Sequence, residues 1–186
     1  MTEVEIKAST APMTLEDIRT KAETAGFEES AILKETDVYF NAPDRNFMKT
    51  DEALRLRTYE DLAAETSKTA VTYKGPKTDS RSNTRTEFET GVEDFATMYS
   101  LLTSLGYVPV FTVSKTRTEL SKDGMTLCLD RVENLGDFIE LEALTEDENK
   151  KEETVEKLLS LLDNLNVSRE NLTRKSYLEM LVSKSR

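Results

Sequence analysis

Hydrophobic and charged residues alternate along several short stretches of the chain. The first stretch, Glu3 to Lys7, would place three ionisable side chains on one face of a strand and Val4 and Ile6 on the other. Similar alternation returns in Arg55-Leu56-Arg57, Thr72-Tyr73-Lys74, Arg85 to Glu89, Lys115-Thr116-Arg117, Thr126 to Asp130 and Glu140-Leu141-Glu142. Cations dominate some of these strands and acids dominate others. Because a solvated sheet face normally carries a looser mixture, the sorted charge favours strands whose charged faces line a closed barrel.

The rest of the pattern predicts about eight strands in total, together with several helices. Further strands are expected over residues 30–40, 53–60, 68–75, 84–91, 113–120, 125–132 and 138–144, and helices over 14–25, 94–105, 153–165 and 169–184. Gly26-Phe27 and Gly106-Tyr107 each follow an expected helix, where glycine is favoured. Because a strand, a helix, a Gly-aromatic pair and further strands occur twice in this order, we predict one domain, 1–186, of two similar halves, with C-terminal helices from about residue 150.

The composition is typical of a soluble globular protein. The 186 residues are 37% hydrophobic and 33% charged, and no apolar run approaches the length of a membrane helix or a signal peptide. We therefore expect a cytoplasmic protein without a membrane partner. The single cysteine, Cys128, is expected to be a small packed side chain. The absence of histidine excludes histidine-based nucleophilic catalysis and leaves carboxylates, lysine, tyrosine and metal-bound water for the chemistry.

The net charge of −11 argues against a nucleic-acid polymer as partner, because such proteins neutralise phosphates with an exposed basic surface. The arginines and lysines at alternating strand positions nevertheless suit phosphate. Both observations are compatible if the exterior is acidic and the cations converge inside a tunnel. Such a tunnel would accept a small polyanion and exclude a large one.

Several motifs in a fixed order carry a resemblance to a known family. They are Glu3-x-Glu5-x-Lys7, Arg55-x-Arg57, Tyr73-Lys74-Gly75, Thr84-Arg85-x-Glu87, Lys115-x-Arg117, Asp130 and Glu140-x-Glu142. The series resembles the CYTH superfamily, the triphosphate tunnel metalloenzymes. Within it, the chain is most similar to the CyaB-type, class IV adenylate cyclase branch, through Asp37-Val38-Tyr39-Phe40, Thr50 to Arg57, Leu135-Gly136-Asp137-Phe138 and Lys175-Ser176-Tyr177.

The resemblance implies an α+β fold, an eight-stranded antiparallel β-barrel with helices packed outside. It implies a triphosphate substrate together with Mg²⁺ or Mn²⁺. The metal ligands would be Glu3, Glu5, Asp130, Glu140 and Glu142. Substrate would be bound by Lys7, Arg55, Arg57, Lys74, Arg85, Lys115, Arg117 and Lys175, and catalysis would depend on Glu3, Glu5, Lys7, Lys74, Lys115 and Arg117.

Three functions stay open at this point. Conversion of ATP to cyclic AMP and pyrophosphate is the first expectation. The alternative is hydrolysis of inorganic triphosphate, thiamine triphosphate or a nucleoside triphosphate. The proteobacterial cyclases of this class carry a His-Phe pair shortly before the first motif, whereas Met1 and Thr2 stand before Glu3 here. The third hypothesis is a non-catalytic module that binds a polyphosphate or nucleotide, and a homodimer is left open.

Overall fold

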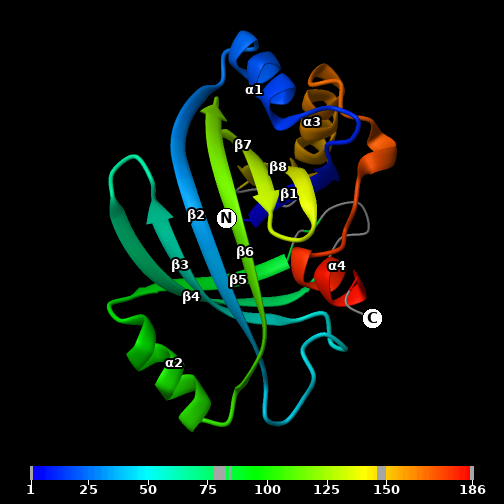
Figure 1. Ribbon diagram of the computed structural model, residues 1–186. Coiled ribbons are helices and arrows are strands. Elements are labelled where there is room, and N and C mark those ends of the chain that lie inside the picture. Colours follow the sequence, from blue (N-terminus) through cyan, green and yellow to red (C-terminus); the bar gives the residue numbers. More distant parts are fainter. Residues whose placement is uncertain (1, 78–82, 84, 146–149, 185–186) are drawn as a thin grey trace.

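Eight antiparallel strands form one sheet that curls into a half-barrel (Figure 1). The computed structural model describes residues 2–77, 83, 85–145 and 150–184, except for the side chains of Thr2 and Glu3. The neighbouring order is β1-β8-β7-β6-β2-β3-β4-β5. The strands are β1 (Thr2–Ser9), β2 (Glu28–Asn41), β3 (Ala53–Asp61), β4 (Thr66–Lys77), β5 (Arg85–Val92), β6 (Val108–Lys122), β7 (Met125–Val132) and β8 (Gly136–Thr145). The expected eight-stranded antiparallel sheet is confirmed.

Helices lie between and after the strands along the chain. They are α1 (Leu15–Thr24), α2 (Phe95–Ser104), α3 (Lys151–Asn164) and α4 (Tyr177–Lys184), with a 3-10 turn η2 (Arg169–Asn171). Thr14 and Asp17 form a reciprocal capping box at the start of α1. Gly26 and Gly106 follow α1 and α2 with φ of 90° and 91°, a conformation that glycine adopts without strain. No helix in the described ranges has the length and hydrophobicity to cross a bilayer.

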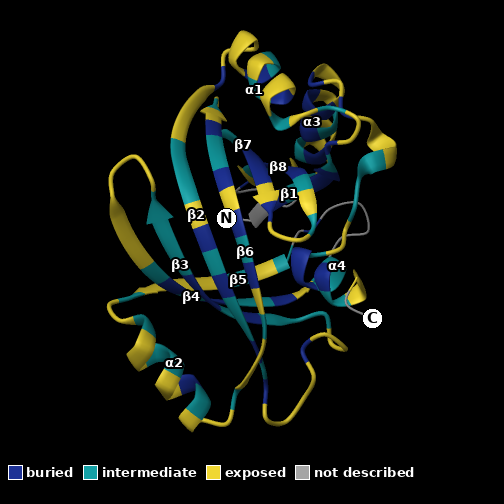
Figure 2. Ribbon diagram, in the orientation of Figure 1, coloured by how far each residue is buried: buried dark blue, intermediate teal, exposed yellow. Residues whose placement is uncertain are grey.

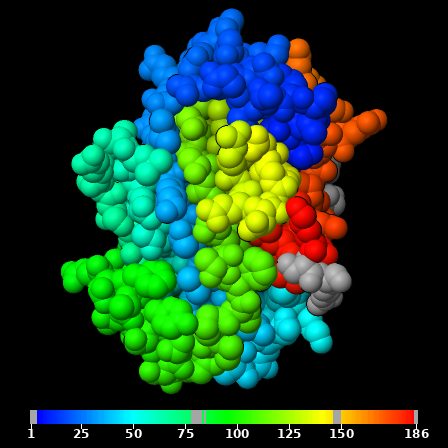
Figure 3. Space-filling view, in the orientation of Figure 1, coloured from blue at the N-terminus to red at the C-terminus, as the bar shows by residue number. Residues whose placement is uncertain are grey.

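The apolar sides of the strands are covered by helices. Val4 and Ile6 of β1 pack with Ile18 of α1 and Leu158 of α3 in the largest buried cluster. α1 and α3 lie at the same end of the molecule (Figures 1 and 3). Leu102 of α2 belongs to a second cluster with residues of β2 and β3, and α4 contributes to a third. Buried segments consequently run along the middle of the sheet, while much of the helix surface is exposed (Figure 2).

The C-terminal segment differs from the expected helix over 169–184. Only η2 and α4 are helical, and the residues between them run along the outer edge of β1. Leu172 forms a bridge with Ala8, and the Thr173 backbone N–H donates to the Lys7 carbonyl at 2.9 Å. The outer edge of an edge strand has backbone N–H and C=O groups without a strand partner. The segment around Leu172 and Thr173 provides hydrogen-bond partners for some of these groups on β1.

The two ends of the curled sheet, β1 and β5, do not share a strand ladder among the described residues. Asn83 bridges part of this edge instead, because its backbone N–H donates to the Glu5 carbonyl at 3.0 Å. β1 is therefore supported by β8 on one side and by short contacts on the other.

Candidate active site in the tunnel

The charged faces of the strands line a cavity of about 340 Å³ inside the curled sheet. Lys7, Arg57 and Arg117 are each only 6% exposed, so the charged face lies inward as the sorted charge predicted. The cavity brings together ten of the predicted site residues: Glu5, Lys7, Arg55, Arg57, Lys74, Arg85, Lys115, Arg117, Glu140 and Glu142. Both faces of these strands are thus used, one for the apolar clusters and one for the cavity.

Three carboxylates from β1 and β8 form one cluster on the cavity wall. Glu5, Glu140 and Glu142 each offer an oxygen within 4.8 Å of the others. They meet because Glu5 lies opposite Glu142 in the ladder, and Lys7 lies opposite Glu140. Asn83 donates to Glu5 Oε1 at 2.9 Å and orients it. An all-oxygen donor set of this kind fits Mg²⁺ or Mn²⁺.

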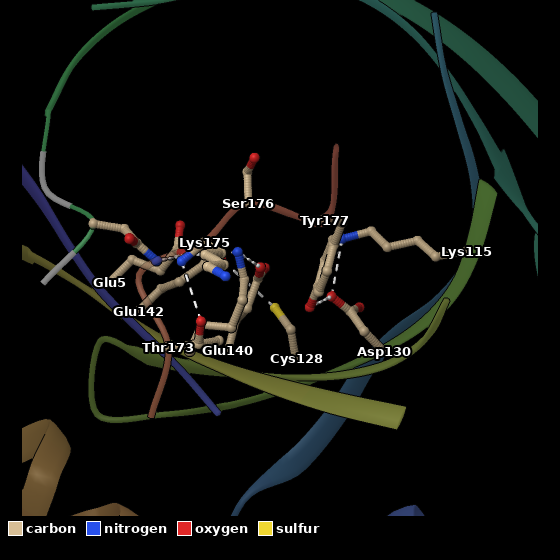
Figure 4. Close-up of polar contacts among 12 residues, drawn as sticks. Glu5, Lys115, Cys128, Asp130, Glu140, Glu142, Thr173, Lys175, Ser176 and Tyr177 are labelled. Carbon is tan, nitrogen blue, oxygen red and sulfur yellow. Dashed lines mark hydrogen bonds and ion pairs between the residues drawn. The ribbon is translucent and has the colours of Figure 1, made fainter. Parts of the chain in front are cut away.

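Two cations lie against this acidic cluster (Figure 4 shows the cluster). Lys7 Nζ is 2.9 Å from Glu140 Oε1 and 3.5 Å from Glu5 Oε1. Arg117 donates to Glu140 Oε2, and its Nη1 is 3.7 Å from Glu142. Burial opposes the charged form of Glu140, but Lys7 and Arg117 outweigh it and hold the pKa of Glu140 well below its usual range. Glu140 is therefore an anion shared by two cations.

Further cations lie on β3, β4 and β5, and Lys115 lies on β6. Arg55 Nε is 3.3 Å from the Thr72 hydroxyl, and Lys74 donates to Glu87 at 2.6 Å. Burial and the neighbouring Arg55 lower the pKa of Lys74, although Glu87 opposes the shift. Arg85 donates to the Gly75 carbonyl at 3.4 Å. These side chains give the cavity a second region that suits phosphate oxygens.

Comparison with known proteins assigns the family. The CYTH domain family matches residues 1–177. The chain belongs to the CYTH family. A Methanocaldococcus jannaschii protein described as "Putative adenylate cyclase MJ0240" is 42% identical over 144 residues, which are 77% of this chain and 79% of that protein. "Adenylate cyclase CyaB" of Aeromonas hydrophila is 28% identical over 144 residues, 77% of this chain and 70% of that protein.

The fold of this CYTH protein also matches a solved structure. The structure of the PH1819 protein from Pyrococcus horikoshii OT3 has a TM-score of 0.89 and 39% sequence identity, and the match covers 98% of this chain and 99% of that one. The family resemblance and the fold expected from the sequence are thereby confirmed.

Asp130, which was also expected to bind metal, lies outside the cluster of Glu5, Glu140 and Glu142. It is fully buried and accepts hydrogen bonds from Arg117 Nε at 2.7 Å and Nη2 at 2.6 Å. Lys115 donates to it at 3.0 Å, and the Tyr177 hydroxyl at 2.8 Å. Because these donors occupy both oxygens, Asp130 serves to hold Lys115 and Arg117 in place.

One other expected residue, Lys175, stands apart from the cavity lining. Lys175 is exposed and does not line the cavity, whereas the next two residues, Ser176 and Tyr177, do. Ser176 caps α4, since the Glu179 N–H donates to its hydroxyl at 3.1 Å and its own N–H donates to the Glu179 carboxylate at 2.6 Å. The side chain of Glu3 lies outside the described part of the chain.

Several side chains of the site were not predicted as site residues from the sequence, and Glu35, Asp37 and Tyr177 are buried ones among them. Glu35 and Asp37 line the cavity from β2 and share the two-residue spacing of the other acid pairs, which is the signal that could have revealed them. Tyr177 lies with its ring centroid 4.4 Å from Lys7 Nζ and 5.2 Å from Lys115 Nζ. Both ammonium groups thus make cation–π contacts with the same ring.

Proposed function

We propose that this CYTH domain is a metal-dependent enzyme that acts on a triphosphate inside the tunnel. The observation that carries the proposal is that Glu5, Glu140 and Glu142 share one cavity with the cations of β3, β4 and β6. Carboxylates suit a divalent ion and the cations suit phosphate oxygens, so one substrate can engage both regions. Phosphoryl transfer depends mainly on such positioning and charge stabilisation.

The charge balance of the cavity supports a metal requirement. Among the described residues, eight basic and eleven acidic side chains line the cavity. A triphosphate with about four negative charges would enter a cavity that is already acidic. Mg²⁺ or Mn²⁺, when bound by Glu5, Glu140 and Glu142, would neutralise charge and help to activate the nucleophile.

The ion pairs of the protein couple the two kinds of ligand. Glu140 neutralises Lys7 and Arg117 in the structure. If Glu140 instead binds a divalent ion, Lys7 and Arg117 each lose one carboxylate partner and can interact more strongly with phosphate oxygens, while Arg117 keeps its contacts with Asp130. Metal and triphosphate should therefore strengthen each other's binding, and the coupling must be equal in both directions.

Adenylate cyclase is the reaction we propose first, because the curated relatives bear that name. In this reaction the ribose 3′-oxygen forms a bond to the α-phosphorus, the bond to the β-phosphate bridge breaks, and pyrophosphate leaves with its electron pair. The 3′-hydroxyl proton passes to solvent or to pyrophosphate. Arg55, Arg57, Lys74 and Arg85 would bind phosphate oxygens, while Lys7, Lys115 and Arg117 would stabilise the charge that develops on transfer.

Triphosphate hydrolysis is the second candidate, because charged side chains dominate the described lining. The aliphatic members of the lining are Met48, Ala53 and Leu178, and its aromatic members are Tyr39, Tyr59 and Tyr177. A bare triphosphate needs only the charged groups, whereas a nucleobase would also have to contact the apolar or aromatic side chains. Hydrolysis of a terminal phosphate would use the same cations and carboxylates.

A product assay separates these functions. The protein is incubated with ATP, inorganic triphosphate or thiamine triphosphate under Mg²⁺ or Mn²⁺, and the products are resolved by ion-exchange chromatography. Cyclic AMP with pyrophosphate supports the cyclase, while orthophosphate with ADP, pyrophosphate or thiamine diphosphate supports the hydrolase. Tight calorimetric binding without turnover would identify a binding module. Absence of both binding and turnover would refute the proposal.

A further inference from the structure

β2 carries two buried acids, Glu35 and Asp37. They lie outside the cluster of Glu5, Glu140 and Glu142 that we propose as the metal site. They are 1% and 3% exposed. Burial opposes their charged forms, but Lys115 and Arg117 around Glu35, and Arg57 and Arg55 around Asp37, outweigh it and lower the pKa of each carboxyl. Both side chains are therefore anions inside the tunnel.

Asp37 holds Arg57 through a two-point contact. Arg57 Nε donates to Oδ1 at 2.5 Å and Nη2 donates to Oδ2 at 2.7 Å. A bidentate contact fixes the plane of the guanidinium as well as its distance. Arg55 Nη1 is 3.8 Å from the same carboxylate, so both arginines of the Arg-x-Arg motif face one anion.

Glu35 links two strands of cations. Its Oε2 is 2.8 Å from Arg57 Nη1 on β3 and 3.2 Å from Lys115 Nζ on β6. The sheet register explains this placement, because Asp37 lies opposite Arg57 and Glu35 lies opposite Lys115 in the ladders that flank β2. β2 thus places one carboxylate beside a cation of β3 and another beside a cation of β6.

We propose that Asp37 and Glu35 are positioning residues that act as permanent counter-ions. They hold Arg57 and Lys115 at their phosphate-binding positions, and they weaken the attraction of these cations for the released polyphosphate product. The inference rests on the proposed function for its catalytic half. The counter-ion role differs from the role proposed for Glu140, which would bind a divalent ion. Asp37 and Glu35 lie outside the Glu5, Glu140 and Glu142 cluster.

Removing one counter-ion should have opposite effects on product binding and on turnover. In Asp37→Asn the side chain keeps its shape, but the cavity gains one unit of positive charge and Arg57 loses its bidentate partner. Pyrophosphate should then bind at least about tenfold more tightly without metal, because a charge-assisted contact becomes available to it. kcat should fall by about tenfold or more, because product leaves slowly and Arg57 is no longer fixed, while KM for triphosphate should not increase.

The experiment compares Asp37→Asn and Glu35→Gln with Glu60→Gln as a matched control. Glu60 lies on the opposite face of β3 from Arg57, its side chain is 46% exposed, and its partner Lys34 is 3.9 Å away. Each variant loses one negative charge, so a change confined to the β2 variants reports position rather than net charge. Binding of pyrophosphate is measured by calorimetry in metal-free buffer, and kcat and KM are measured on the triphosphate that the wild-type protein consumes.

The outcomes separate a positioning role from a structural one. Tighter pyrophosphate binding with lower kcat in the β2 variants supports the proposal. A lower melting temperature with unchanged pyrophosphate affinity and unchanged kcat would overturn it, and so would weaker pyrophosphate binding. If Asp37→Asn does not fold, Glu35→Gln gives the same comparison. The calorimetric measurement needs no turnover. If the wild-type protein is inactive but a β2 variant binds pyrophosphate more tightly, the counter-ion role is supported and the proposed reaction is refuted.

Discussion

Replacement of Glu140 by glutamine tests the proposed metal site most directly. Glu140 accepts from Lys7 at 2.9 Å and from Arg117, and it clusters with Glu5 and Glu142. Glutamine preserves the shape of the side chain but removes the negative charge and one of the two acceptor oxygens. The substitution therefore weakens a proposed metal ligand and two ion pairs while leaving the packing intact.

The effect on stability should be moderate. An isolated buried charge left without its partner costs about 3–5 kcal/mol. Here Lys7 retains Glu5 at 3.5 Å, and Arg117 retains its two contacts with Asp130. Loss of repulsion among the three carboxylates offsets part of the remaining cost, so we expect the free energy of unfolding to fall by about 1–3 kcal/mol.

The effect on turnover should be much larger. Loss of one metal ligand removes about 3–4 kcal/mol of transition-state stabilisation, which is roughly a 10²–10³-fold fall in rate. Binding of triphosphate without metal should persist, because the cations of β3 and β4 remain and the cavity loses a negative charge. Glu140→Gln should therefore separate substrate binding from catalysis.

Turnover is measured as a function of Mg²⁺ and Mn²⁺ concentration, beside calorimetric titration with triphosphate and urea unfolding. Glu60→Gln again controls for the lost charge. A normal rate with an unchanged metal requirement in Glu140→Gln would show that this carboxylate is not a metal ligand. A variant that is unfolded before ligand is added would show instead that Glu140 mainly maintains the fold.

Three further results are expected. Tyr177→Phe should lower the free energy of unfolding in urea by about 1.5–3 kcal/mol, because a buried hydroxyl that donates to the charged Asp130 at 2.8 Å is lost; an unchanged value would contradict that bond. The melting temperature should fall as pH drops below the ordinary pKa values of 3.8 for Asp37 and 4.5 for Glu140. Both pKa values are lower in the folded protein, so in this range the unfolded chain takes up protons that the folded protein does not; a constant melting temperature between about pH 5 and 3 would contradict this. Addition of a chelator of divalent metal to the assay should stop turnover. The same chelator should not lower the melting temperature of protein that was prepared without metal.

The inward charged face could be predicted because charge was sorted by strand. Arg55-x-Arg57 and Glu140-x-Glu142 show the two-residue period with one sign of charge each, a pattern that water alone does not require. The resemblance then supplied the order of the motifs. The family and the eight-stranded sheet followed from these observations and were confirmed.

The contacts that each inward-facing acid makes could not be predicted in the same way. Asp130 and Glu140 lie on neighbouring strands and both point inward, but Asp130 pairs with Phe138 in the ladder, whereas Glu140 pairs with Cys128. The two acids are therefore at different levels along the sheet. Asp130 accepts hydrogen bonds from Lys115 and Tyr177, whereas Glu140 lies beside Glu5. A one-dimensional pattern gives the face of a strand but not the neighbour on another strand.

The C-terminal segment shows a similar limit. Apolar residues at Leu172, Leu178, Leu181 and Val182 are compatible with one helix, so local periodicity predicted helix over 169–184. The unpaired edge of β1, at the other end of the sequence, instead takes Leu172 and Thr173 as partners. Tertiary hydrogen bonding outweighs helical propensity here, because an edge carbonyl needs a donor.

The arrangement of acids explains how so many cations can be buried before any ligand arrives. Buried cations without partners would cost several kcal/mol each, yet Lys7, Arg57, Lys115 and Arg117 each have a carboxylate within 3.2 Å. If every carboxylate were a fixed partner, phosphate would gain little by entering, because it would have to displace them all.

A tunnel in which some acids can transfer to a divalent ion avoids this difficulty. In the proposed mechanism Glu140 would leave Lys7 when metal binds, whereas Asp37 would remain with Arg57 whether or not metal is bound. The affinity for triphosphate is then set by metal at one wall and limited by permanent anions at the other. Variants at Glu140 and Asp37 should consequently respond to metal in different ways: the first should weaken the dependence of triphosphate affinity on Mg²⁺, and the second should leave that dependence intact while raising affinity at every metal concentration. Equal metal dependence in the two variants, measured by calorimetry over a range of Mg²⁺ concentrations, would show that the two kinds of acid do not differ.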